Sequence, residues 1–546
     1  MGFYLVQGGS SLWFVDTAGT KTQLTLPSGV TLSTTRRPRF AVFGQRVIMT
    51  NSPSVNLVIN PDGTVNRLTP ATPGSAPVLG NTGSGNLSGV YRARTSFLIL
   101  DEFGDVVSES PIGPASGASP DLTTEKLSVS GVPVSTDSDV NARRIYRTLT
   151  GGSVYFHWLD LDGNTLTTFT DDAQDAALST LSAPDYLGVP PGATDAVQMK
   201  IITEWRGRLW GVSSARPDYV LYTPADTPYA WPAANSLIVQ PLGADSEGNV
   251  AFMRRRDELG IAKRDSISKI IGSDETNFEP KNIINGVGCV AQETVVIIRD
   301  TAYFLSEDGV YTWGADGLNS ISKEHVDPWF TKDTYFNRSK FSTAFAKWNQ
   351  KYDLYELHLP SPSQTTLDRW VAYDVRKKIW LGPHKTGAFT PTCAAAIEDA
   401  NDLAVPVMGS SAGAIWKQNQ SGSADGSTAV EFNAKMRPMS MDEPDLQKYF
   451  GQLSLISRKE AEIEGGTPTV SVYAAVGDVD ASEQAVITAD LELGRQLLRR
   501  LSTSAQPVGR YLTLRFYNNF LNEESADEQP LMLYGIEFPW GSIGRR

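Results

Sequence analysis

The chain has 546 residues, of which 40 % are apolar, 10 % are aromatic and only 20 % are charged. This length exceeds an ordinary domain of about 100–200 residues, so we expect two to four domains or one large repeat architecture. With 47 glycines and 32 prolines the chain turns often, which excludes a coiled coil and argues against a helical bundle or a disordered protein. The net charge of −13 argues against tight general binding of DNA, because proteins that grip duplex DNA normally present a basic face.

The cysteines and the hydropathy pattern narrow the class further. The two cysteines, Cys289 and Cys393, form no disulfide framework and no zinc cluster. The first residues lack a basic segment followed by an apolar run, so we expect no signal peptide. No stretch approaches about 18 consecutive apolar residues, which predicts a soluble protein without a membrane span.

The chain begins with short runs that are typical of strands. Runs such as SLWFVD and RFAVFG are four to six residues long, rich in β-branched and aromatic residues, and separated by Gly, Ser, Asn, Pro and Asp. Residues 1–68 are therefore predicted to be the first strands of a β-propeller-like body. The same texture continues to the C-terminus, and helical periodicity appears only near 483–500, where it is ambiguous. The sequence predicts an all-β protein.

A separate module is predicted next. Residues 69–85 are rich in Pro, Gly, Ser and Thr and are interpreted as a linker. Residues 87–182 then contain six or seven short strand-like runs, which favours an inserted β-sandwich of the fibronectin or immunoglobulin type. A Pro/Gly-rich break follows at 183–193. The alternative is that these strands belong to the surrounding sheets.

Residues 194–418 return to the texture of the first region. Strand pairs across Gly- or Asp-rich turns recur at roughly 30–50 residues, which is the spacing of propeller blades. Five tryptophans fall in these recurring segments: Trp210, Trp313, Trp370, Trp380 and Trp416. An irregular β-sandwich assembly is the alternative. A polar stretch at 419–428 precedes residues 429–546, which are predicted to be a C-terminal β-domain.

Reactive side chains are scarce. The chain has four histidines, His157, His325, His358 and His384, and none occurs at a metal-ligand spacing. His157 and His358 lie in aromatic, strand-like runs and are interpreted as ordinary half-buried histidines.

Two motifs resemble functional loops. Residues 409–413, GSSAG, match the G-x-S-x-G nucleophile motif, but a strand-like run follows and no histidine comes later, so a hairpin turn is favoured. Residues 160–164, DLDGN, resemble the start of a calcium loop, but Thr165 replaces the glycine and Asp171 the glutamate that an EF-hand needs. A hairpin turn is favoured here too.

Paired acids and clustered basic residues complete the candidates. Asp171–Asp172 and Glu523–Glu524 are interpreted as solvated turns, although a glycosidase pair from distant acids stays open. The basic clusters are interpreted as solvated turns and subunit salt bridges, with contact to DNA or to an acidic partner as the alternative. They lie at 36–39, 143–144, 254–256, 376–378, 499–500 and 545–546. No catalytic, cofactor-binding or metal-binding residue is predicted, and the chain is not expected to be an enzyme.

Several segments resemble the tail nozzle, or hub, proteins of short-tailed bacteriophages, also called tail tubular protein B or packaged-DNA stabilisation proteins. The first is the module, with GVYRAR at 89–94, LDEFG at 100–104, RRIYRT at 143–148 and TFTD at 168–171. The second is SEDGVYTW at 306–313 with Ile321–Ser322, which is similar to a blade-closing strand of that family. The third, AYDVR at 372–376 through Trp380, is similar to another blade strand.

The resemblance implies a structural protein of the virion, made in the host cytoplasm. It implies a homo-hexameric ring below the portal and the tail adaptor, with a channel that retains packaged DNA and permits its ejection. Tail fibres or tailspikes would attach around this ring, and DNA would pass without sequence-specific binding. An acidic chain suits such a channel, because it repels DNA rather than holding it. The alternatives are a receptor- or carbohydrate-binding tail protein, with an exposed aromatic platform near acids, and a polysaccharide depolymerase.

Overall fold

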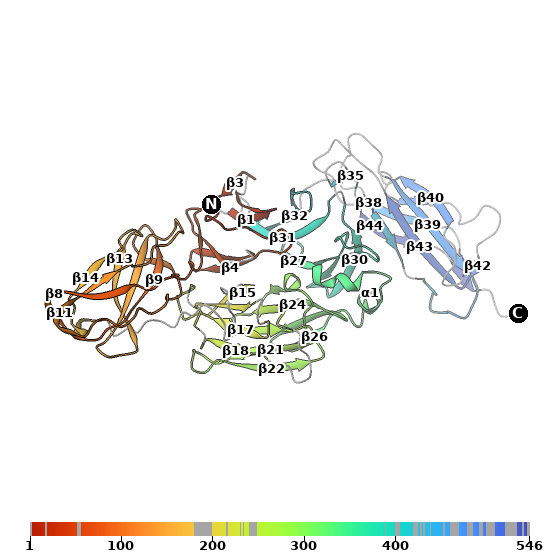
Figure 1. Ribbon diagram of the computed structural model, residues 1–546. Helices are drawn as coiled ribbons and strands as arrows, with labels where there is room; N and C mark the ends of the chain where they lie inside the picture. The colour runs from red at the N-terminus through yellow and green to blue at the C-terminus, as the bar shows by residue number, and fades with distance from the viewer. Residues whose placement is uncertain are drawn as a thin grey trace. The chain divides into compact units, whose positions relative to one another are not determined.

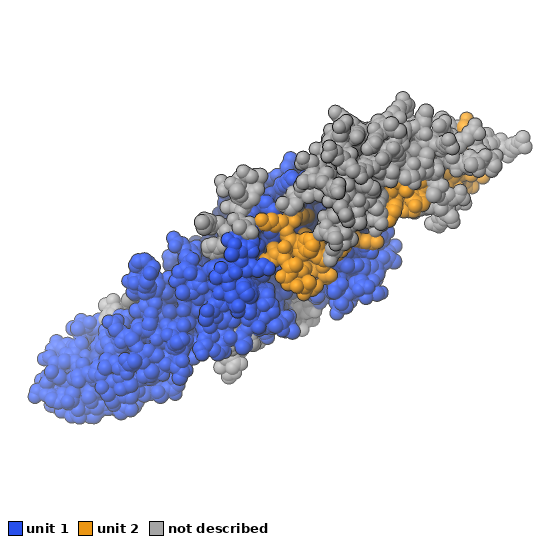
Figure 2. Space-filling model, turned by 90° about the horizontal axis from the view of Figure 1, so that it is seen from above, with its two compact units in different colours: residues 1–384, 393–407 blue, residues 385–392, 408–546 orange. Residues whose placement is uncertain are grey.

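The computed structural model describes most of the chain, in the ranges 3–16, 19–51, 56–178, 199–213, 217–229, 231–232, 234–239, 248–387, 389–398, 404–418 and shorter segments between 424 and 542. These residues form 45 strands, one short α-helix and three 3₁₀ helices, which confirms the all-β prediction (Figure 1). The chain divides into two compact units. The first contains residues 1–384 and 393–407, and the second contains residues 385–392 and 408–546 (Figure 2).

The body of the first unit is a series of antiparallel sheets whose strands follow one another in chain order. The first sheet has three strands, β1 (Phe3–Gly8), β2 (Ser11–Asp16) and β3 (Lys21–Leu24). The next two have four strands each: β4 (Arg39–Phe43), β5 (Arg46–Thr50), β6 (Asn56–Ile59) and β7 (Val65–Arg67); then β15 (Met199–Trp205), β16 (Arg208–Ser213), β17 (Tyr219–Tyr222) and β18 (Ser236–Ile238).

Three further four-stranded sheets have the same build. They are β19 (Ala251–Arg254), β20 (Leu259–Ala262), β21 (Ser266–Ile271) and β22 (Glu279–Asn285); β23 (Val296–Ile298), β24 (Thr301–Ser306), β25 (Gly309–Gly314) and β26 (Gly317–Ser320); and β27 (Phe345–Asn349), β28 (Leu354–Leu359), β29 (Arg369–Asp374) and β30 (Ile379–Lys385). From β15 onward the first strands begin at Met199, Ala251, Val296 and Phe345, so the repeat lies at the long end of the predicted spacing.

Each sheet buries a face against the next sheet in the series. Leu12 of β2 clusters with Met49 of β5, and Ile48 of β5 clusters with Leu209 of β16. Aromatic residues join aliphatic ones in the following interface, where the ring centroids of Trp210 and Tyr222 lie 4.8 Å apart. The later interfaces are built in the same way around apolar clusters of β19–β26 and β23–β30. A single sheet could not bury both faces, so stacking supplies the core.

The start and the end of this series meet. Arg37, just before β4, donates hydrogen bonds to the backbone oxygens of Thr343 and Ala344, just before β27. Arg39 of β4 forms an ion pair with Glu293, which lies in the 3₁₀ helix η2 (Gln292–Thr294) before β23. Contacts between residues about 300 positions apart thus close the series, and the body is β-propeller-like as predicted.

Two short helices connect the sheets β23–β26 and β27–β30. The helix α1 (Asp327–Thr331) and the 3₁₀ helix η3 (Arg338–Thr343) bridge β26 and β27, and Phe330 of α1 and Phe341 of η3 are buried together. Gly309 begins β25 at φ 152°, where a side chain would collide with the Ser322 hydroxyl. A three-stranded sheet follows in the chain, β31 (Pro391–Glu398), β32 (Ala404–Ser410) and β33 (Ile415–Lys417).

The module inserted between β7 and β15 is a β-sandwich of two antiparallel sheets. One sheet has the order β10-β9-β12-β13, and the other has the order β14-β11-β8. Leu127 and Ile145, one from each sheet, belong to the apolar cluster between them. The strands are β8 (Val78–Gly89), β9 (Ala93–Leu100), β10 (Val106–Glu109), β11 (Leu122–Ser130), β12 (Ala142–Thr148), β13 (Tyr155–Asp162) and β14 (Phe169–Asp171), followed by the 3₁₀ helix η1 (Asp175–Ala177).

The predicted linker at 69–85 is wrong over its second half. Residues 78–85 belong to β8, which pairs with β11 over most of its length with two register shifts. Close packing requires a glycine at position 85, because a side chain there would collide with Lys126 and Asp172. The glycines of this segment therefore admit a neighbouring strand. The predicted break at 183–193 lies outside the described residues.

The second unit is also built from antiparallel strands. Its largest sheet has the order β36-β43-β39-β40, with Val472, Leu514 and Phe516 buried in it. The helical interpretation near 483–500 is wrong, because the described residues there form β40 and β41. The strands are β34 (Ala424–Asp425), β35 (Thr428–Ala429), β36 (Phe432–Lys435), β37 (Lys448–Phe450), β38 (Ser454–Arg458), β39 (Thr469–Gly477), β40 (Gln484–Asp490), β41 (Arg495–Leu497), β42 (Val508–Gly509), β43 (Tyr511–Asn518), β44 (Met532–Glu537) and β45 (Trp540–Ser542).

Candidate functional site

The four histidines form no single cluster, although the rings of His358 and His384 both pack on Trp370. His157 of β13 is partly exposed, with its Nε2 3.1 Å from the carboxylate of Asp160, and His325 is exposed before α1. His358 of β28 is only 3 % exposed, so the expectation of a half-buried residue is wrong for it. His384 of β30 packs on Trp370, with ring centroids 4.2 Å apart.

The serine motif is a turn, as predicted. Ser410 ends β32, and β33 begins at Ile415. The backbone N–H of Ser410 donates to the carbonyl of Ala414, and the N–H of Gly413 donates back to Ser410. No helix follows the serine, so the strand–turn–helix setting of a nucleophile elbow is missing at this motif.

The resemblance to a calcium loop fails because Asp160 and Asn164 already have partners, and the described residues offer no group of acids there that could hold a metal ion. Asp160 accepts two hydrogen bonds from Arg144, at 2.8 and 2.9 Å. Asn164 exchanges hydrogen bonds with the backbone of Ser135. The favoured alternative, a hairpin turn, is also wrong, because β13 and β14 belong to different sheets of the sandwich.

Asp171 is not the solvated acid that the sequence suggested. It is 3 % exposed and forms an ion pair with Arg147, which is itself fully buried. Burial raises the pKa of Asp171, opposed by hydrogen bonds from the Ala173 N–H and from Arg147. Asp172 accepts hydrogen bonds from Asn86 instead. Glu523 and Glu524 lie outside the described residues.

Three of the four basic clusters within the described residues are at least partly built into the fold rather than solvated. Arg143 is fully buried and donates to the carbonyl oxygens of Pro133 and Gly163. Arg255 lies over the ring of Trp313 and pairs with Glu258. The cluster at 376–378 lies at the exposed turn after β29, and those at 499–500 and 545–546 fall outside the described residues.

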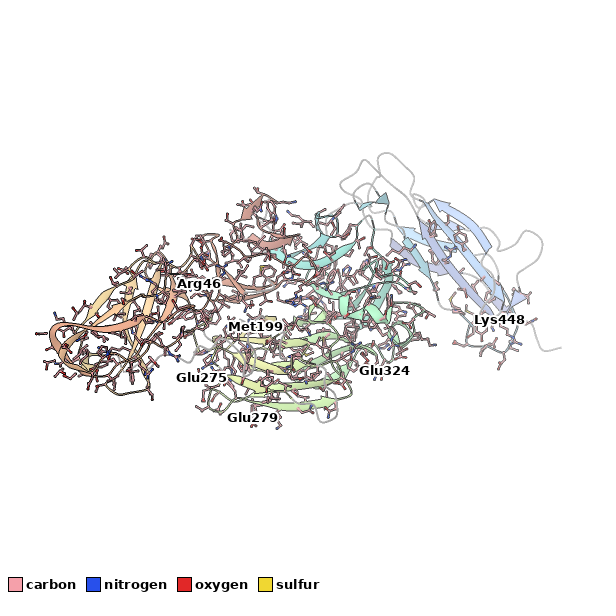
Figure 3. All side chains as sticks on the ribbon, in the orientation of Figure 1. Arg46, Met199, Glu275, Glu279, Glu324 and Lys448 are labelled. Carbon is pink, nitrogen blue, oxygen red and sulfur yellow. The ribbon has the colours of Figure 1, made fainter. Side chains whose placement is uncertain are left out.

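The sandwich is fastened to the body by apolar and charged contacts. Ile99 and Val107 of the module join the cluster that contains Ile48 and Leu209 of the body. Arg46, which is labelled in Figure 3, begins β5. Its guanidinium lies 3.2 Å from the carboxylate of Asp101. Two more tethers link Arg67 to Asp137 and the Ser108 hydroxyl to the Leu68 carbonyl. These contacts restrain the module against its blade.

A buried network lies beside this junction. The Glu109 carboxylate is 1 % exposed and accepts hydrogen bonds from Ser96 at 2.7 Å, Tyr146 at 2.5 Å and Arg144 at 3.1 Å. Burial, reinforced by the neighbouring Glu109, raises the pKa of Tyr146 far above its usual range. Tyr146 therefore stays protonated and donates.

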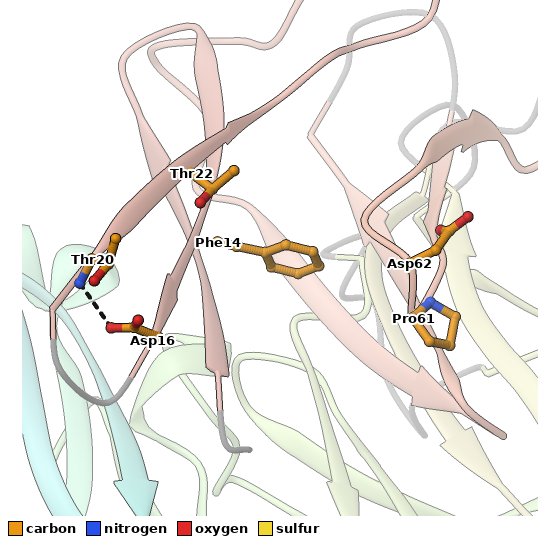
Figure 4. Close-up of a pocket in the computed structure, with 6 residues that line it drawn as sticks. All are labelled: Phe14, Asp16, Thr20, Thr22, Pro61 and Asp62. Atoms are coloured by element: carbon orange, nitrogen blue, oxygen red, sulfur yellow. Dashed lines mark hydrogen bonds between the residues drawn. The ribbon is translucent and has the colours of Figure 1, made fainter.

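A shallow pocket opens on the first two sheets (Figure 4). The ring of Phe14 lies between Asp16 on one side and Asp62 on the other, and Thr20, Thr22 and Pro61 complete the lining. The backbone N–H and the hydroxyl of Thr64 both donate to Asp62 and lower the pKa of that carboxyl. An aromatic ring between two carboxylates is the chemistry that a carbohydrate-binding site would use.

One face of the sheet β27–β30 is unusual because it buries charge. Lys347 and Glu356 are cross-strand partners that are 6 % and 1 % exposed, and their charged groups approach to 2.9 Å. Asn349, on the same face, donates to the other carboxylate oxygen at 2.7 Å. His358 stacks on Phe345 at 4.5 Å between ring centroids, and neither of its ring nitrogens has a hydrogen bond. Nothing in the sequence marked this cluster, because a single charged residue between apolar neighbours, such as Lys347 in β27 or Glu356 in β28, is equally typical of a strand with one solvated face.

Neither a metal site nor a spanning helix is found among the described residues. No group of three His, Cys, Asp or Glu side chains there could hold a metal ion. No helix of the described part of the chain is long and apolar enough to cross a membrane. Cys289 is buried, which raises the pKa of its thiol to about 12, and Cys393 is exposed.

Comparisons with known proteins give only distant likenesses. No protein-family model and no curated protein matches the chain. Among solved structures, PorZ, a surface component of the type-IX secretion system of Porphyromonas gingivalis, is 9 % identical with a TM-score of 0.28, over 100 % of this chain and 80 % of PorZ. Hsv2 of Kluyveromyces lactis is 9 % identical with a TM-score of 0.24, over 69 % of this chain and 92 % of Hsv2. Likenesses this weak bear on neither the function nor the family.

Proposed function

We propose that the chain is a structural protein of a short-tailed phage, which forms the nozzle ring that retains packaged DNA and releases it on infection. The observation that carries the proposal is how the charged residues of the described body and module are used. Basic side chains such as Arg37, Arg143 and Arg255 bind backbone oxygens or carboxylates within the chain, and Arg37 helps to close the series of blades. These three side chains are therefore not available to phosphates, and the net charge of −13 disfavours a grip on DNA.

The body and the module suit a wall that must bear load. Successive sheets pack through clusters of buried aliphatic and aromatic residues, and the module is restrained by apolar contacts and ion pairs. Such packing resists deformation, because interiors at crystal-like density transmit strain rather than absorb it. In this proposal the ring is a homo-hexamer that contacts the tail adaptor above and fibres or tailspikes around it, without enzymatic activity.

The position of the protein in the particle tests this function. An antibody fragment raised against the sandwich module can be applied to purified virions, which are then imaged by negative stain. The label is expected to mark a six-fold ring below the adaptor. Label at the tip of a trimeric fibre would overturn the nozzle and favour receptor binding.

The second candidate, a carbohydrate-binding tail protein, is favoured by the pocket at Phe14. It predicts saturable binding of the host's surface polysaccharide that is lost in Phe14→Ala and weakened in Asp62→Asn. Asp101→Asn, a change of the same kind at the module junction, is the matched control. The nozzle proposal expects no saturable binding by any of these proteins.

A further inference from the structure

Three polar side chains meet on the buried face of β27 and β28. Lys347 and Asn349 are two positions apart in β27, so both side chains leave the same face of the strand. Glu356 lies opposite Lys347 in β28. Its Oε2 is 2.9 Å from the Lys347 Nζ, and its Oε1 accepts a hydrogen bond from the Asn349 Nδ2 at 2.7 Å. One carboxylate therefore contacts both an amine and an amide nitrogen.

The surroundings exclude water from these groups. Lys347 is 6 % exposed, and Asn349 and Glu356 are each 1 % exposed. The same face carries Phe345 and His358, whose stacked rings are also buried. Attack of an amine on a side-chain amide at this place would not compete with hydrolysis of the amide, because bulk water does not reach it.

The amine is poorly stabilised as a cation. Although Nζ lies close to Glu356, it makes no aligned hydrogen bond. Burial lowers the pKa of Lys347, and the neighbouring carboxylate offsets this only in part. A lysine amine is a nucleophile only when neutral, and burial is the ordinary way in which proteins favour that form.

We propose that Lys347 and Asn349 are joined by an amide bond between their side chains, formed within the folded protein with Glu356 as the proton carrier. Side chains two positions apart on one face of a strand leave backbone atoms about 7 Å apart, which the aliphatic stem of a lysine can span. The geometry resembles that of a general acid–base catalyst held between a nucleophile and its leaving group.

The reaction balances without any further reactant. A proton first passes from the Lys347 Nζ to Oε2 of Glu356, which leaves a neutral amine and a neutral acid. Nζ then attacks Cγ of Asn349 and the Cγ–Nδ2 bond breaks. Glu356 gives its proton to the departing nitrogen and receives the remaining proton from Nζ. The products are one amide, one ammonia and a protonated Glu356, with no change of oxidation state.

The bond has a direct signature in the mass of the protein. The purified full-length chain is expected to weigh about 17 Da less than its sequence, the mass of one ammonia. Trypsin is expected to skip the acylated Lys347, so that residues 341–351 appear as one peptide lighter by the same amount. Fragmentation of this peptide would give no breaks between residues 347 and 349. Ammonia loss at Asn285–Gly286 is the competing source of the same mass change, and it falls on a different peptide.

Variants test the roles of the proton carrier and of the leaving group. Glu356→Gln keeps the size of the side chain but cannot carry the proton, so its mass is expected to equal its sequence mass. Asn349→Asp would lose water instead of ammonia, which gives about 18 Da below its own sequence mass. Lys351→Arg, at an exposed position in the turn after β27, is the matched control and is expected to keep the bond.

One result overturns the proposal whatever the variants do. If the folded wild-type protein has its full sequence mass after prolonged incubation, and trypsin cleaves after Lys347, the side chains are not joined. Lys347 and Glu356 would then form an ordinary buried ion pair.

Discussion

The sandwich module and the sheet β27–β30 each bury charged side chains, but they satisfy them differently. In the module, Arg147 bonds to Asp171, to the Ala173 carbonyl at 2.9 Å and to Asp175 at 3.2 Å. Its guanidinium also lies over the rings of Tyr91 and Trp158, at 4.8 and 5.2 Å. In the blade, Lys347 has a single carboxylate at 2.9 Å and no aligned hydrogen bond.

This difference shows that burial alone does not determine whether a charged side chain stabilises the fold or is kept reactive. Moving an ion from water into the protein interior costs several kcal/mol, and an ion pair offsets this cost only when additional hydrogen bonds satisfy both partners. The module distributes its charge over many partners, which holds one geometry. The blade leaves its charge under-satisfied, which favours the neutral and reactive form of the amine. Substitutions in the two regions should therefore have distinct signatures.

The largest effect is expected from Arg147→Met. The variant leaves Asp171 buried without its counter-ion, which should lower the free energy of unfolding by about 3–5 kcal/mol. Urea denaturation followed by tryptophan fluorescence measures the loss, since Trp158 lies beside the site. The double variant Arg147→Met with Asp171→Leu should recover most of it. A single-variant loss below about 1 kcal/mol would show that the pair is not essential to the module.

Tyr146→Phe should cost about 2 kcal/mol, because it removes a hydroxyl that donates to the buried Glu109 carboxyl group and leaves the shape unchanged. Tyr155→Phe, at the partly buried start of β13, is the matched control for Tyr146→Phe. That change should cost much less by the same denaturation assay. Equal losses in the two variants would contradict a network centred on Glu109.

His358 predicts how the stability of the blade depends on pH. Burial, with a further contribution from Lys347, lowers the pKa of this imidazole well below its ordinary value in the folded protein. Below about pH 6.5 the unfolded chain takes up a proton that the folded chain does not. The free energy of unfolding should therefore fall by up to about 1.4 kcal/mol per pH unit as the pH decreases.

The variant His358→Phe keeps a ring on Phe345 and should reduce this slope between pH 6.5 and 5. The exposed His325→Gln is the control and should leave the slope as it is. An unchanged slope in His358→Phe would mean that the imidazole gains a partner in solution.

The smallest effect is expected at the module junction. Arg46→Ala breaks a partly exposed ion pair with Asp101, for which the expected cost is about 0–1 kcal/mol and which salt should screen. The apolar cluster around Ile99 and Val107 remains in place. Denaturation at low and high salt measures the loss, and one above about 2 kcal/mol would show that the ion pair, not the cluster, holds the module.

Much of the fold could be predicted because the signals for strands and turns lie within a few neighbouring residues. Alternating apolar and aromatic runs with Gly- and Asp-rich turns indicated the strands, and the recurrence of tryptophans such as Trp210 and Trp313 indicated stacked sheets. The failures occurred where a local signal was overridden. The Gly-rich start of β8 was interpreted as a linker, although Gly80 and Gly85 admit the neighbouring strand β11.

The charged clusters could not be predicted, because their partners are remote in the sequence. Arg37 meets Thr343 and Ala344 only after the blades have closed. Asp171, read as a solvated acid, is buried because the sandwich brings it to Arg147. The pocket at Phe14 likewise joins two sheets, and nothing in either strand alone marks it.

The sequence by itself determined the class of the fold, the approximate place of the module and the scarcity of reactive groups, since these depend on composition and on neighbours a few residues apart. Only the tertiary structure decided which charges are buried and with whom they pair. The carboxylate of Glu356 contacts both Lys347 and Asn349 because strand pairing places them on one face. Packing then removes the water that would otherwise separate them.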